Sequence, residues 1–403
     1  MGWHGSRREF HGLVAGGAAA LAAGTWPLAQ AHAVQEGAMT AEPTDFDDHF
    51  PIRPDELVLR ALQPAPPRTL RFAEHPGPPE TWRKICRERL AELLGLASAD
   101  SSSAAIAVPQ SAVRRLRATE HAGVTIEAWV MQVDRNLSLS AYLLLPQAAS
   151  RPSAATAAAI MAIHGHGEVE PCLGARDDYH HMFALRLAQA GHVVLCPELR
   201  GFGALHDMAR SDEGYWLDYW DSRRGRQFTL VTDAFLHGRT LIGQTVEDLL
   251  RWESWLAQAR GVERCDVAGI SYGGDLAFTY PVFSRRVRKI YTSGSMGSLA
   301  GIFSRCYNAP AHCIPGILRW MDRSDIAGLN APRPIRLHYG ELDKPGPDNA
   351  SAAYNESVAP ALAELRAIYR AFGADADKLV TLRVTPQRGH EIESDDLLAF
   401  LAD

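Results

Sequence analysis

The chain has 403 residues, of which 46% are hydrophobic and 22% are charged, and its formal net charge is −6. This composition is typical of a globular protein that buries one large core or two modest ones, and it excludes disorder over most of the chain. The charge is mild and no basic face or run of Lys and Arg stands out, so we expect no nucleic-acid partner.

Residues 1–33 have the features of an export signal. Ser6-Arg7-Arg8-Glu9-Phe10 resembles the twin-arginine motif, and a weakly apolar stretch over residues 12–24 follows it. Ala31-His32-Ala33 then offers a cleavage site of the small-x-small type. Because the apolar stretch is shorter than the ~20 residues that span a bilayer, we predict a cleaved signal and no stable membrane insertion afterwards. The protein would then be exported, either periplasmic or secreted.

Residues 34–110 are predicted to form an N-terminal lead-in. Its first part is rich in Pro, Ala and acidic residues, with one short helix possible near residues 56–62. Over residues 81–94, apolar side chains recur with the 3.6-residue period of a helix, and Gly95 stands where a helix C-cap belongs. We therefore predict one amphipathic helix that docks on the main body.

Residues 111–403 are predicted to form one α/β domain with a mostly parallel twisted sheet. Three segments near the start of this domain have alternating or continuous apolar residues, which predicts antiparallel strands. They are residues 113–119, 124–133 and 137–145. After them, short apolar runs alternate with helical periods, which predicts a parallel sheet covered by helices on both faces. The strand-length runs are residues 160–163, 193–196, 266–270, 288–292, 335–339 and 379–384, and the clearest helices are residues 240–257 and 351–372.

The six cysteines are widely spread and include no Cys-x-x-Cys pair. Cys196 and Cys265 lie in or beside apolar strand-like runs, where a buried free thiol is expected. Cys306 and Cys313 are near enough in sequence to pair, so a disulfide between them stays open.

The pentapeptide Gly269-Ile270-Ser271-Tyr272-Gly273 has the Gly-x-Ser-x-Gly pattern. An apolar strand-like run precedes it and a sequence able to form a helix follows, which is the context of a nucleophile elbow. Small residues must flank such a serine so that strand and helix pack closely while its hydroxyl stays exposed. The pattern predicts Ser271 as a nucleophile.

A serine nucleophile needs a base and an orienting carboxylate, and both follow later strands. His390 lies in a loop between the last predicted strand and a terminal helix, and Asp343 follows the strand over residues 335–339. The order Ser271, Asp343, His390 is that of α/β-hydrolases and differs from those of chymotrypsin and subtilisin. Glu341 stands two residues before Asp343 and stays open as the acid.

Donors for a developing oxyanion are expected from His164-Gly165-His166-Gly167, the loop after the strand over residues 160–163. Glycines there let backbone N–H groups turn toward a negative oxygen, and the N–H of Tyr272 would be the second donor. We favour the N–H of His166, with Gly165 or Gly167 as alternatives.

Taken together, these motifs resemble bacterial α/β-hydrolases, in particular the dienelactone-hydrolase-like and acetyl-xylan-esterase-like group, from about residue 81 to the C-terminus. The resemblance implies the α/β-hydrolase fold and hydrolysis of carboxylic esters through an acyl-enzyme, often on esters attached to carbohydrate. Asp343 is followed by Lys344-Pro345, which departs from the usual acid loop. The segments that carry the likeness are residues 164–167, 197–203, 269–274, 325–327 and 331–334, with the loops of Asp343 and His390.

Histidines and acids elsewhere suggest a metal cluster only weakly. No known ligand spacing links them, and the glycines explain the first two histidines better, so we predict no metal and no cofactor. The residues concerned are His164, His166, Asp177, Asp178, His180 and His181.

Residues 204–239 form a long insertion whose middle is aromatic and charged. In the fold that the resemblance implies, such segments cover the pocket at the carboxyl edge of the sheet. Trp216 and Trp220 could stack on a sugar ring there, or merely anchor the loop.

The sequence therefore predicts an exported serine esterase that acts on a small-molecule or carbohydrate ester. Two alternatives stay open. One is a serine peptidase of the prolyl-oligopeptidase type, although too few residues precede His164 for a propeller or large β domain. The other is a hydrolase-fold binding protein without activity. The acyl group, the alcohol and the oligomeric state are not predicted.

Overall fold

The structure is a computed structural model, and it describes residues 68–96, 108–147, 159–205, 222–299, 310–343 and 350–403. The predicted export signal and the possible helix at residues 56–62 lie outside these ranges, as do Trp216, Trp220 and Cys306.

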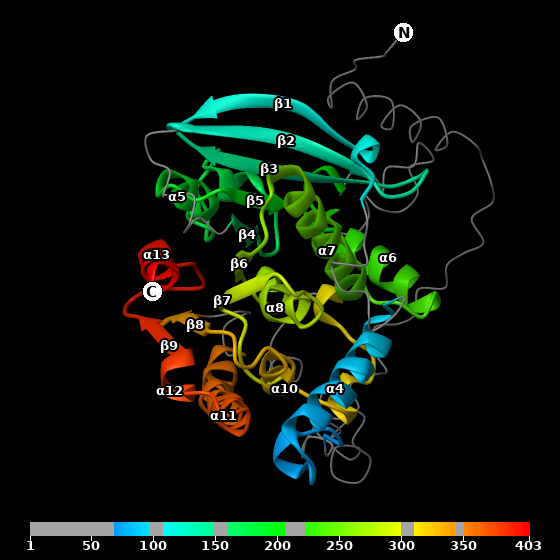
Figure 1. The fold of residues 1–403 in the computed structure, drawn as a ribbon, viewed down its shortest axis with the longest axis vertical. Helices are drawn as coiled ribbons and strands as arrows, with labels where there is room; N and C mark the ends of the chain where they lie inside the picture. The colour runs from blue at the N-terminus through cyan, green and yellow to red at the C-terminus, as the bar shows by residue number, and fades with distance from the viewer. Residues whose placement is uncertain (1–67, 97–107, 148–158, 206–221, 300–309, 344–349) are drawn as a thin grey trace, which may run out of the picture. The chain divides into compact units, whose positions relative to one another are not determined.

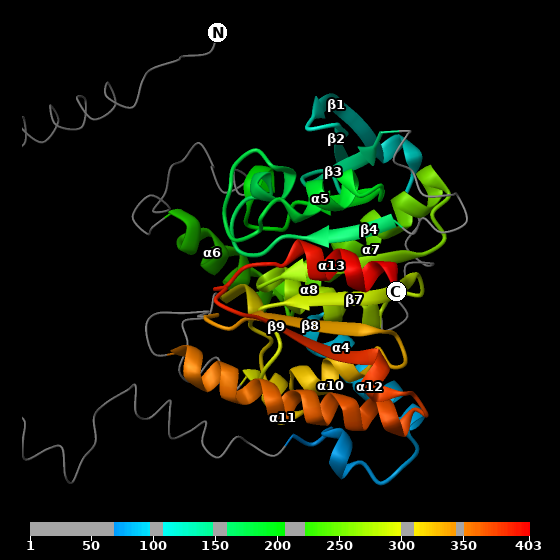
Figure 2. The same cartoon turned by 90° about the vertical axis from the view of Figure 1, so that its left-hand side faces the viewer.

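The described residues form one nine-stranded sheet in the order β1-β2-β3-β5-β4-β6-β7-β8-β9 (Figures 1 and 2). Strands β1 to β3 pair antiparallel, β3 pairs antiparallel with β5, and all later pairings are parallel. The predicted fold class, a mostly parallel sheet with antiparallel N-terminal strands, is confirmed. The strands are β1 (Val113–His121), β2 (Val124–Gln132), β3 (Ser138–Pro146), β4 (Ala159–Ile163), β5 (Val194–Pro197), β6 (Cys265–Ile270), β7 (Val287–Ser293), β8 (Ile335–Gly340) and β9 (Val380–Thr385).

Helices cover both faces of the sheet, as predicted. Alternate residues of a strand point to opposite faces, and β4 divides accordingly: Met161 and Ile163 join one core cluster, whereas Ile160 and Ala162 join the other. The first cluster contains residues of α4, α7, α8, α10 and α11, and the second contains residues of α5 and α13 (Figure 1). The helices are α4 (Pro79–Leu94), α5 (Phe183–Gln189), α6 (Ser222–Leu236), α7 (Leu241–Arg260), α8 (Tyr272–Thr279), α10 (Arg323–Gly328), α11 (Ala350–Ala371), α12 (Ala376–Leu379) and α13 (Ser394–Ala402).

The predicted amphipathic helix forms as α4. Its apolar positions Trp82, Cys86 and Leu90 are fully buried in the first core cluster. The helix ends at Gly95, whose φ of 69° is the left-handed conformation expected of a C-cap glycine. The indole N–H of Trp82 donates to the carbonyl of Leu70 at 2.8 Å, which joins the helix to the segment before it.

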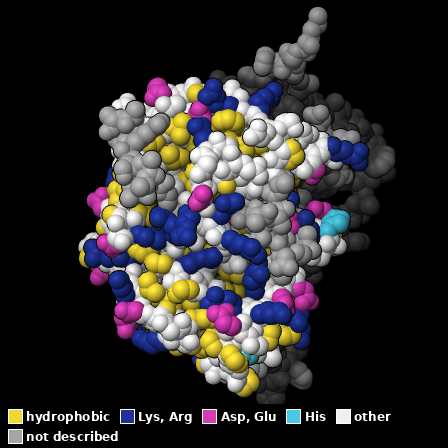
Figure 3. Space-filling model, viewed as in Figure 1, with side chains coloured by type: hydrophobic (Ala, Val, Ile, Leu, Met, Phe, Trp, Pro, Cys, Tyr) yellow, Lys and Arg dark blue, Asp and Glu magenta, His cyan; other side chains and the backbone are white. Residues whose placement is uncertain are grey.

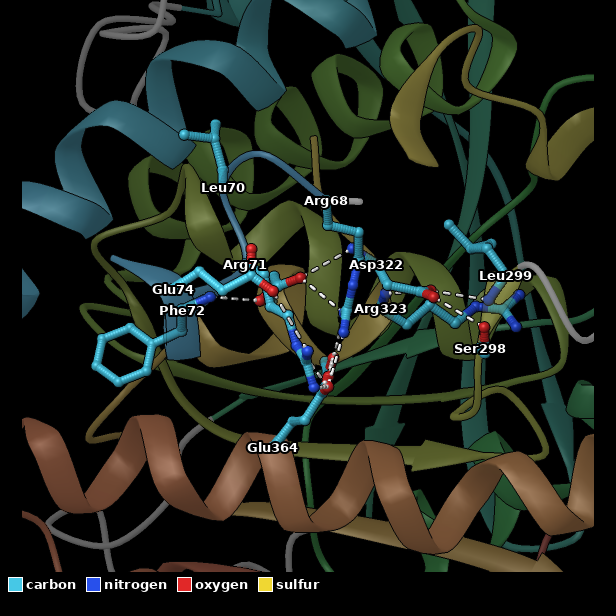
Figure 4. A network of polar contacts seen from close by, with 12 residues as sticks. Arg68, Leu70, Arg71, Phe72, Glu74, Ser298, Leu299, Asp322, Arg323 and Glu364 are labelled. Atoms are coloured by element: carbon cyan, nitrogen blue, oxygen red, sulfur yellow. Dashed lines mark hydrogen bonds and ion pairs between the residues drawn. The ribbon is translucent and has the colours of Figure 1, made fainter. Parts of the chain in front are cut away.

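A polar network joins residues 68–74 to α10 and α11 (Figure 4). Arg68 pairs with Asp325 at 3.0 Å and with Glu364 at 2.7 Å, and the N–H of Phe72 donates to Asp325 at 3.2 Å. Asp322, which caps α10, accepts hydrogen bonds from the residues that follow β7, Ser298 and Leu299, each at 2.8 Å. Residues 68–74 are thereby connected, through α10, to the segment that follows β7.

Cys196 and Cys265 are buried free thiols, as predicted. Cys313 also carries a free thiol, whereas Cys306, with which the sequence leaves a pairing open, lies outside the described residues. Within the described ranges, no helix combines the length and the apolar character needed to cross a membrane.

Lys and Arg side chains gather over the middle of one face of the molecule, the face seen in Figure 1 (Figure 3). The expectation that no basic face stands out is therefore wrong. The sequence did not show it because the basic residues are separated along the chain and collected only by folding. The absence of a nucleic-acid partner stays a prediction.

Candidate active site

Ser271 lies at the turn between β6 and α8, with φ 58° and ψ −121°. A positive φ is rare and strained for a residue with a side chain, and it is typical of a nucleophile elbow. A Cβ added at Gly269 would collide with the carbonyl of Gly273, and one added at Gly273 would collide with the carbonyl of Ile163. The glycines of the motif are therefore required by the close packing of β6, α8 and β4.

The segment that follows β7 links Ser271 to the other predicted catalytic residues. The N–H of Ser271 donates to the carbonyl of Ser293 at 2.8 Å, and the hydroxyl of Ser295 donates to the carbonyl of Ser271 at 2.5 Å. A Cβ added at Gly294, between them, would lie 2.6 Å from Cε1 of His390 and 3.2 Å from Oδ2 of Asp343. Gly294 thus lets three parts of the chain meet at one edge of the sheet.

His390 faces Asp343. Nδ1 of the imidazole lies 2.8 Å from Oδ1 of Asp343, whose carboxyl is buried, whereas the His390 side chain is 22% exposed. We assign the proton to Nδ1 because a carboxylate accepts there, which leaves Nε2 as an acceptor in the neutral ring. Glu341, the alternative acid, is exposed and instead accepts from the backbone N–H and the side chain of Gln387.

The loop over residues 164–167 packs against the serine. A Cβ added at Gly165 would lie 3.0 Å from Cβ of Ser271. The N–H of Gly165 donates to Nε2 of His180 at 2.8 Å, so it is not available to an oxyanion. The backbone N–H groups of His166 and Tyr272 bond to no group in the described part of the chain. The geometry therefore disfavours the N–H of Gly165, one of the three donors that the sequence leaves open.

His164 and His166 are both held neutral by burial. Burial lowers the pKa of His164 to about 3, and its ring accepts from the N–H of Leu199 at 3.1 Å and donates from Nδ1 to the carbonyl of Gly165 at 2.8 Å. Burial, together with the neighbouring imidazole of His312, also lowers the pKa of His166 well below its usual value. The loop thus carries no charge at neutral pH.

Sequence reasoning missed a second histidine–carboxylate pair next to the serine. Nδ1 of His312 lies 2.5 Å from Oδ2 of Asp275, which also accepts from Arg323 at 2.6 Å, and all three side chains are buried. Burial raises the pKa of Asp275, but the charges of Arg323 and His312 outweigh it, and the pKa lies below its usual value. The His312 ring stacks on His166 at 5.0 Å and packs edge-on against Tyr272 at 4.9 Å.

A signal for this pair existed only in part. Asp275 lies in the first turn of α8, directly after the Gly-x-Ser-x-Gly-Gly sequence, and could have been suspected from that position. His312 lies in a short 3-10 turn, η8 (Pro310–His312), which no hydrophobic period in the sequence predicts.

The insertion helix α6 packs against η8 and α7, while Trp216 and Trp220 lie outside the described residues.

The histidines and acids that the sequence only weakly suggests as a metal cluster have other partners. His180 accepts from Gly165 and lies 2.7 Å from Asp178, and His181 pairs with Glu391. Where the chain is described, no three side chains of His, Cys, Asp or Glu gather in a group that could hold a metal ion.

No protein-family model matches the sequence, and no curated protein matches it. Solved structures do match the fold. A candidate acetyl xylan esterase from Bacteroides fragilis has a TM-score of 0.60 at 16% identity, over 83% of this chain and 82% of that one. A glucuronoyl esterase from Solibacter usitatus has a TM-score of 0.52 at 12% identity, over 84% of this chain and 96% of that one. An acetyl xylan esterase from Paenibacillus sp. R4 has a TM-score of 0.50 at 14% identity, over 85% of this chain and 98% of that one. At these identities the likeness shows an α/β-hydrolase fold.

Proposed function

We propose that this chain is a serine carboxylic-ester hydrolase that works through an acyl-enzyme and acts on esters of carbohydrates. One observation carries the proposal: the strained Ser271 lies beside Gly294, and the His390–Asp343 pair packs against that same glycine. Ser271, His390 and Asp343 are far apart in sequence but follow strands at the carboxyl edge of one sheet, which supports the roles of nucleophile, base and acid in acyl transfer.

In the first step the hydroxyl oxygen of Ser271 attacks the ester carbonyl, and Nε2 of His390 takes the hydroxyl proton. Asp343 holds the ring and stabilises the imidazolium that forms. The negative carbonyl oxygen accepts from the N–H groups of His166 and Tyr272, each worth about 3 kcal/mol in the transition state. Collapse expels the alcohol, which takes the proton from His390.

In the second step water attacks the acyl-enzyme, and His390 again takes and returns one proton. The carboxylic acid leaves and the hydroxyl of Ser271 is restored. All bonds made and broken belong to the ester, the serine, water and the N–H of His390 that carries the proton, so the proposed reaction needs no cofactor.

Two observations support a carbohydrate ester as the substrate. Acetyl xylan esterases and a glucuronoyl esterase share the fold over more than four fifths of this chain. The insertion over residues 204–239 is rich in aromatic residues, and we propose that Trp216 and Trp220 stack on a sugar ring.

We also propose that residues 1–33 direct export through the twin-arginine pathway. Replacing Arg7 and Arg8 with Lys should leave the precursor uncleaved and in the cytoplasm, whereas the parent chain should reach the periplasm or the medium. Cell fractionation with N-terminal sequencing measures both. Export of the double variant at the parental level would refute the assignment.

The function is tested with Ser271→Ala beside Ser138→Ala, an exposed serine on β3. Purified mature chain is assayed on p-nitrophenyl acetate, acetylated xylan, methyl-esterified pectin and aminoacyl-anilides. We expect turnover of one or more esters but not of anilides, loss of that turnover in Ser271→Ala, and parental activity in Ser138→Ala, all with unchanged circular dichroism. Preference for anilides would support a peptidase. No turnover and no labelling by a fluorophosphonate would support a binding protein.

A further inference from the structure

One short segment crosses between the two loops on which the proposed chemistry depends. Residues 178–181 precede α5 and contact both the loop over residues 164–167 and the loop that carries His390. The backbone of this segment is strained, because His181 and the following Met182 have φ of 46° and 54°. Such conformations in residues with side chains persist only where surrounding contacts hold them.

On the first side, the segment and the loop's own histidine fix successive peptide groups. The hydroxyl of Tyr179 donates to the carbonyl of His166 at 2.6 Å, and Nδ1 of His164 donates to the carbonyl of Gly165 at 2.8 Å. In a trans peptide the C=O and the N–H point in opposite directions. Fixing these two carbonyls therefore directs the N–H groups of His166 and Gly167 to the opposite side of the loop.

On the second side, the same tyrosine holds the proposed base. Its ring stacks on His390, with centroids 5.6 Å apart and planes inclined by 28°. Its backbone carbonyl accepts from the N–H of Ile392 at 3.2 Å, and the next-but-one residue, His181, pairs with Glu391. His390 and the two residues that follow it are thus tied to this segment or lie against it.

We propose that Tyr179 is a positioning residue that holds the His166–Gly167 peptide, next to the proposed donor N–H of His166, in place relative to the base His390. Its hydroxyl orients the loop over residues 164–167, and its ring orients the imidazole. This inference rests on the proposed function. Since Tyr179 acts through the loop and the imidazole that it orients, its loss should lower kcat with little change in KM.

Tyr179→Phe tests the hydroxyl because it keeps the stacked ring. The chain supplies a matched control in Tyr369→Phe, since Tyr369 on α11 also donates its hydroxyl to a backbone carbonyl, that of Arg333, at 2.7 Å. We expect kcat to fall roughly tenfold in Tyr179→Phe, with KM within about twofold of the parent. Tyr369→Phe should leave kcat and KM within about twofold. Tyr179→Leu, which removes the ring as well, should lower kcat further.

Melting temperatures, measured for every variant, verify that each is folded. Labelling of Ser271 by a fluorophosphonate should be slower in Tyr179→Phe than in Tyr369→Phe. Equal kcat values in the two phenylalanine variants, or a change confined to KM, would overturn the positioning role while leaving the proposed function intact. A parent protein that hydrolyses no ester and takes no label would overturn both.

Discussion

Two histidine–aspartate pairs lie near Ser271, and they look alike in contact geometry. Nδ1 lies 2.8 Å from the carboxylate in His390–Asp343 and 2.5 Å in His312–Asp275. Each pair leaves Nε2 of its histidine without a hydrogen bond to any residue in the described ranges. Distance alone does not distinguish a base from a structural pair.

The two pairs differ in access and in charge. The His390 side chain is 22% exposed, whereas that of His312 is 7% exposed and packs against both His166 and Tyr272. Asp275 shares its carboxylate with Arg323 and lies within α8, while Asp343 follows the end of β8. A base must reach its substrate, so this difference favours His390 as the proposed base, while His312–Asp275 is a buried pair that packs against His166 and Tyr272.

Replacing each histidine should break the comparison most clearly. We expect His390→Ala to lower kcat/KM by about 10⁴-fold or more, because the proton acceptor is lost. His312→Ala should lower it by less than about tenfold, through looser packing of His166. Steady-state kinetics on the best ester measures both. The opposite ranking would make His312 the base.

Replacing the acid that pairs with the base should also lower kcat strongly. Asp343→Asn is expected to lower kcat by about 10³- to 10⁴-fold, since the amide cannot stabilise the imidazolium or fix its tautomer. Glu341 lies two residues earlier and is exposed, so the kcat of Glu341→Gln should stay within about twofold of the parent. A larger loss in Glu341→Gln than in Asp343→Asn would exchange the two roles.

Asp275→Asn should act on stability. It removes the buried carboxylate that pairs with both Arg323 and His312, so the free energy of unfolding should fall by about 3 kcal/mol. Asp377→Asn removes the exposed partner of Arg370, and the free energy of unfolding should change by less than about 1 kcal/mol. Urea unfolding measures both variants. Equal stabilities would mean that the buried pair contributes no more than a surface pair.

His338 sharpens the comparison by isolating what burial does to a histidine. Burial lowers its pKa to about 4, while the unfolded chain titrates near 6.5. As the pH falls from about 6.5 toward 4, the unfolded state binds a proton that the folded state does not, so stability falls. His338→Gln should reduce this slope by about 1.4 kcal/mol per pH unit. Urea unfolding at several pH values decides.

The sheet and its long helices could be predicted because their signals are local. The buried run over residues 266–270 and the helical period over residues 240–257 report burial residue by residue, and β6 and α7 begin and end within three residues of those ranges. Gly95 marked the end of α4 for a similar reason, since a left-handed C-cap excludes most other residues.

The rest of the site depends on contacts between distant loops. Tyr179 and His312 lie outside regular strands and α-helices, where neither period 2 nor period 3.6 applies, and their partners are far away in sequence. Glu341 and Asp343 are the same kind of residue two positions apart. Only the turn after β8, which buries Asp343 and exposes Glu341, separates them.

The central claim is that Ser271 is activated by His390 and not by His312. Mass spectrometry after brief exposure to a fluorophosphonate tests it most directly, with the parent, His390→Ala and His312→Ala labelled in parallel. We predict one adduct, on Ser271, formed at similar rates in the parent and His312→Ala and nearly absent in His390→Ala. An adduct on another residue, or rapid labelling of Ser271 in His390→Ala, would contradict the account.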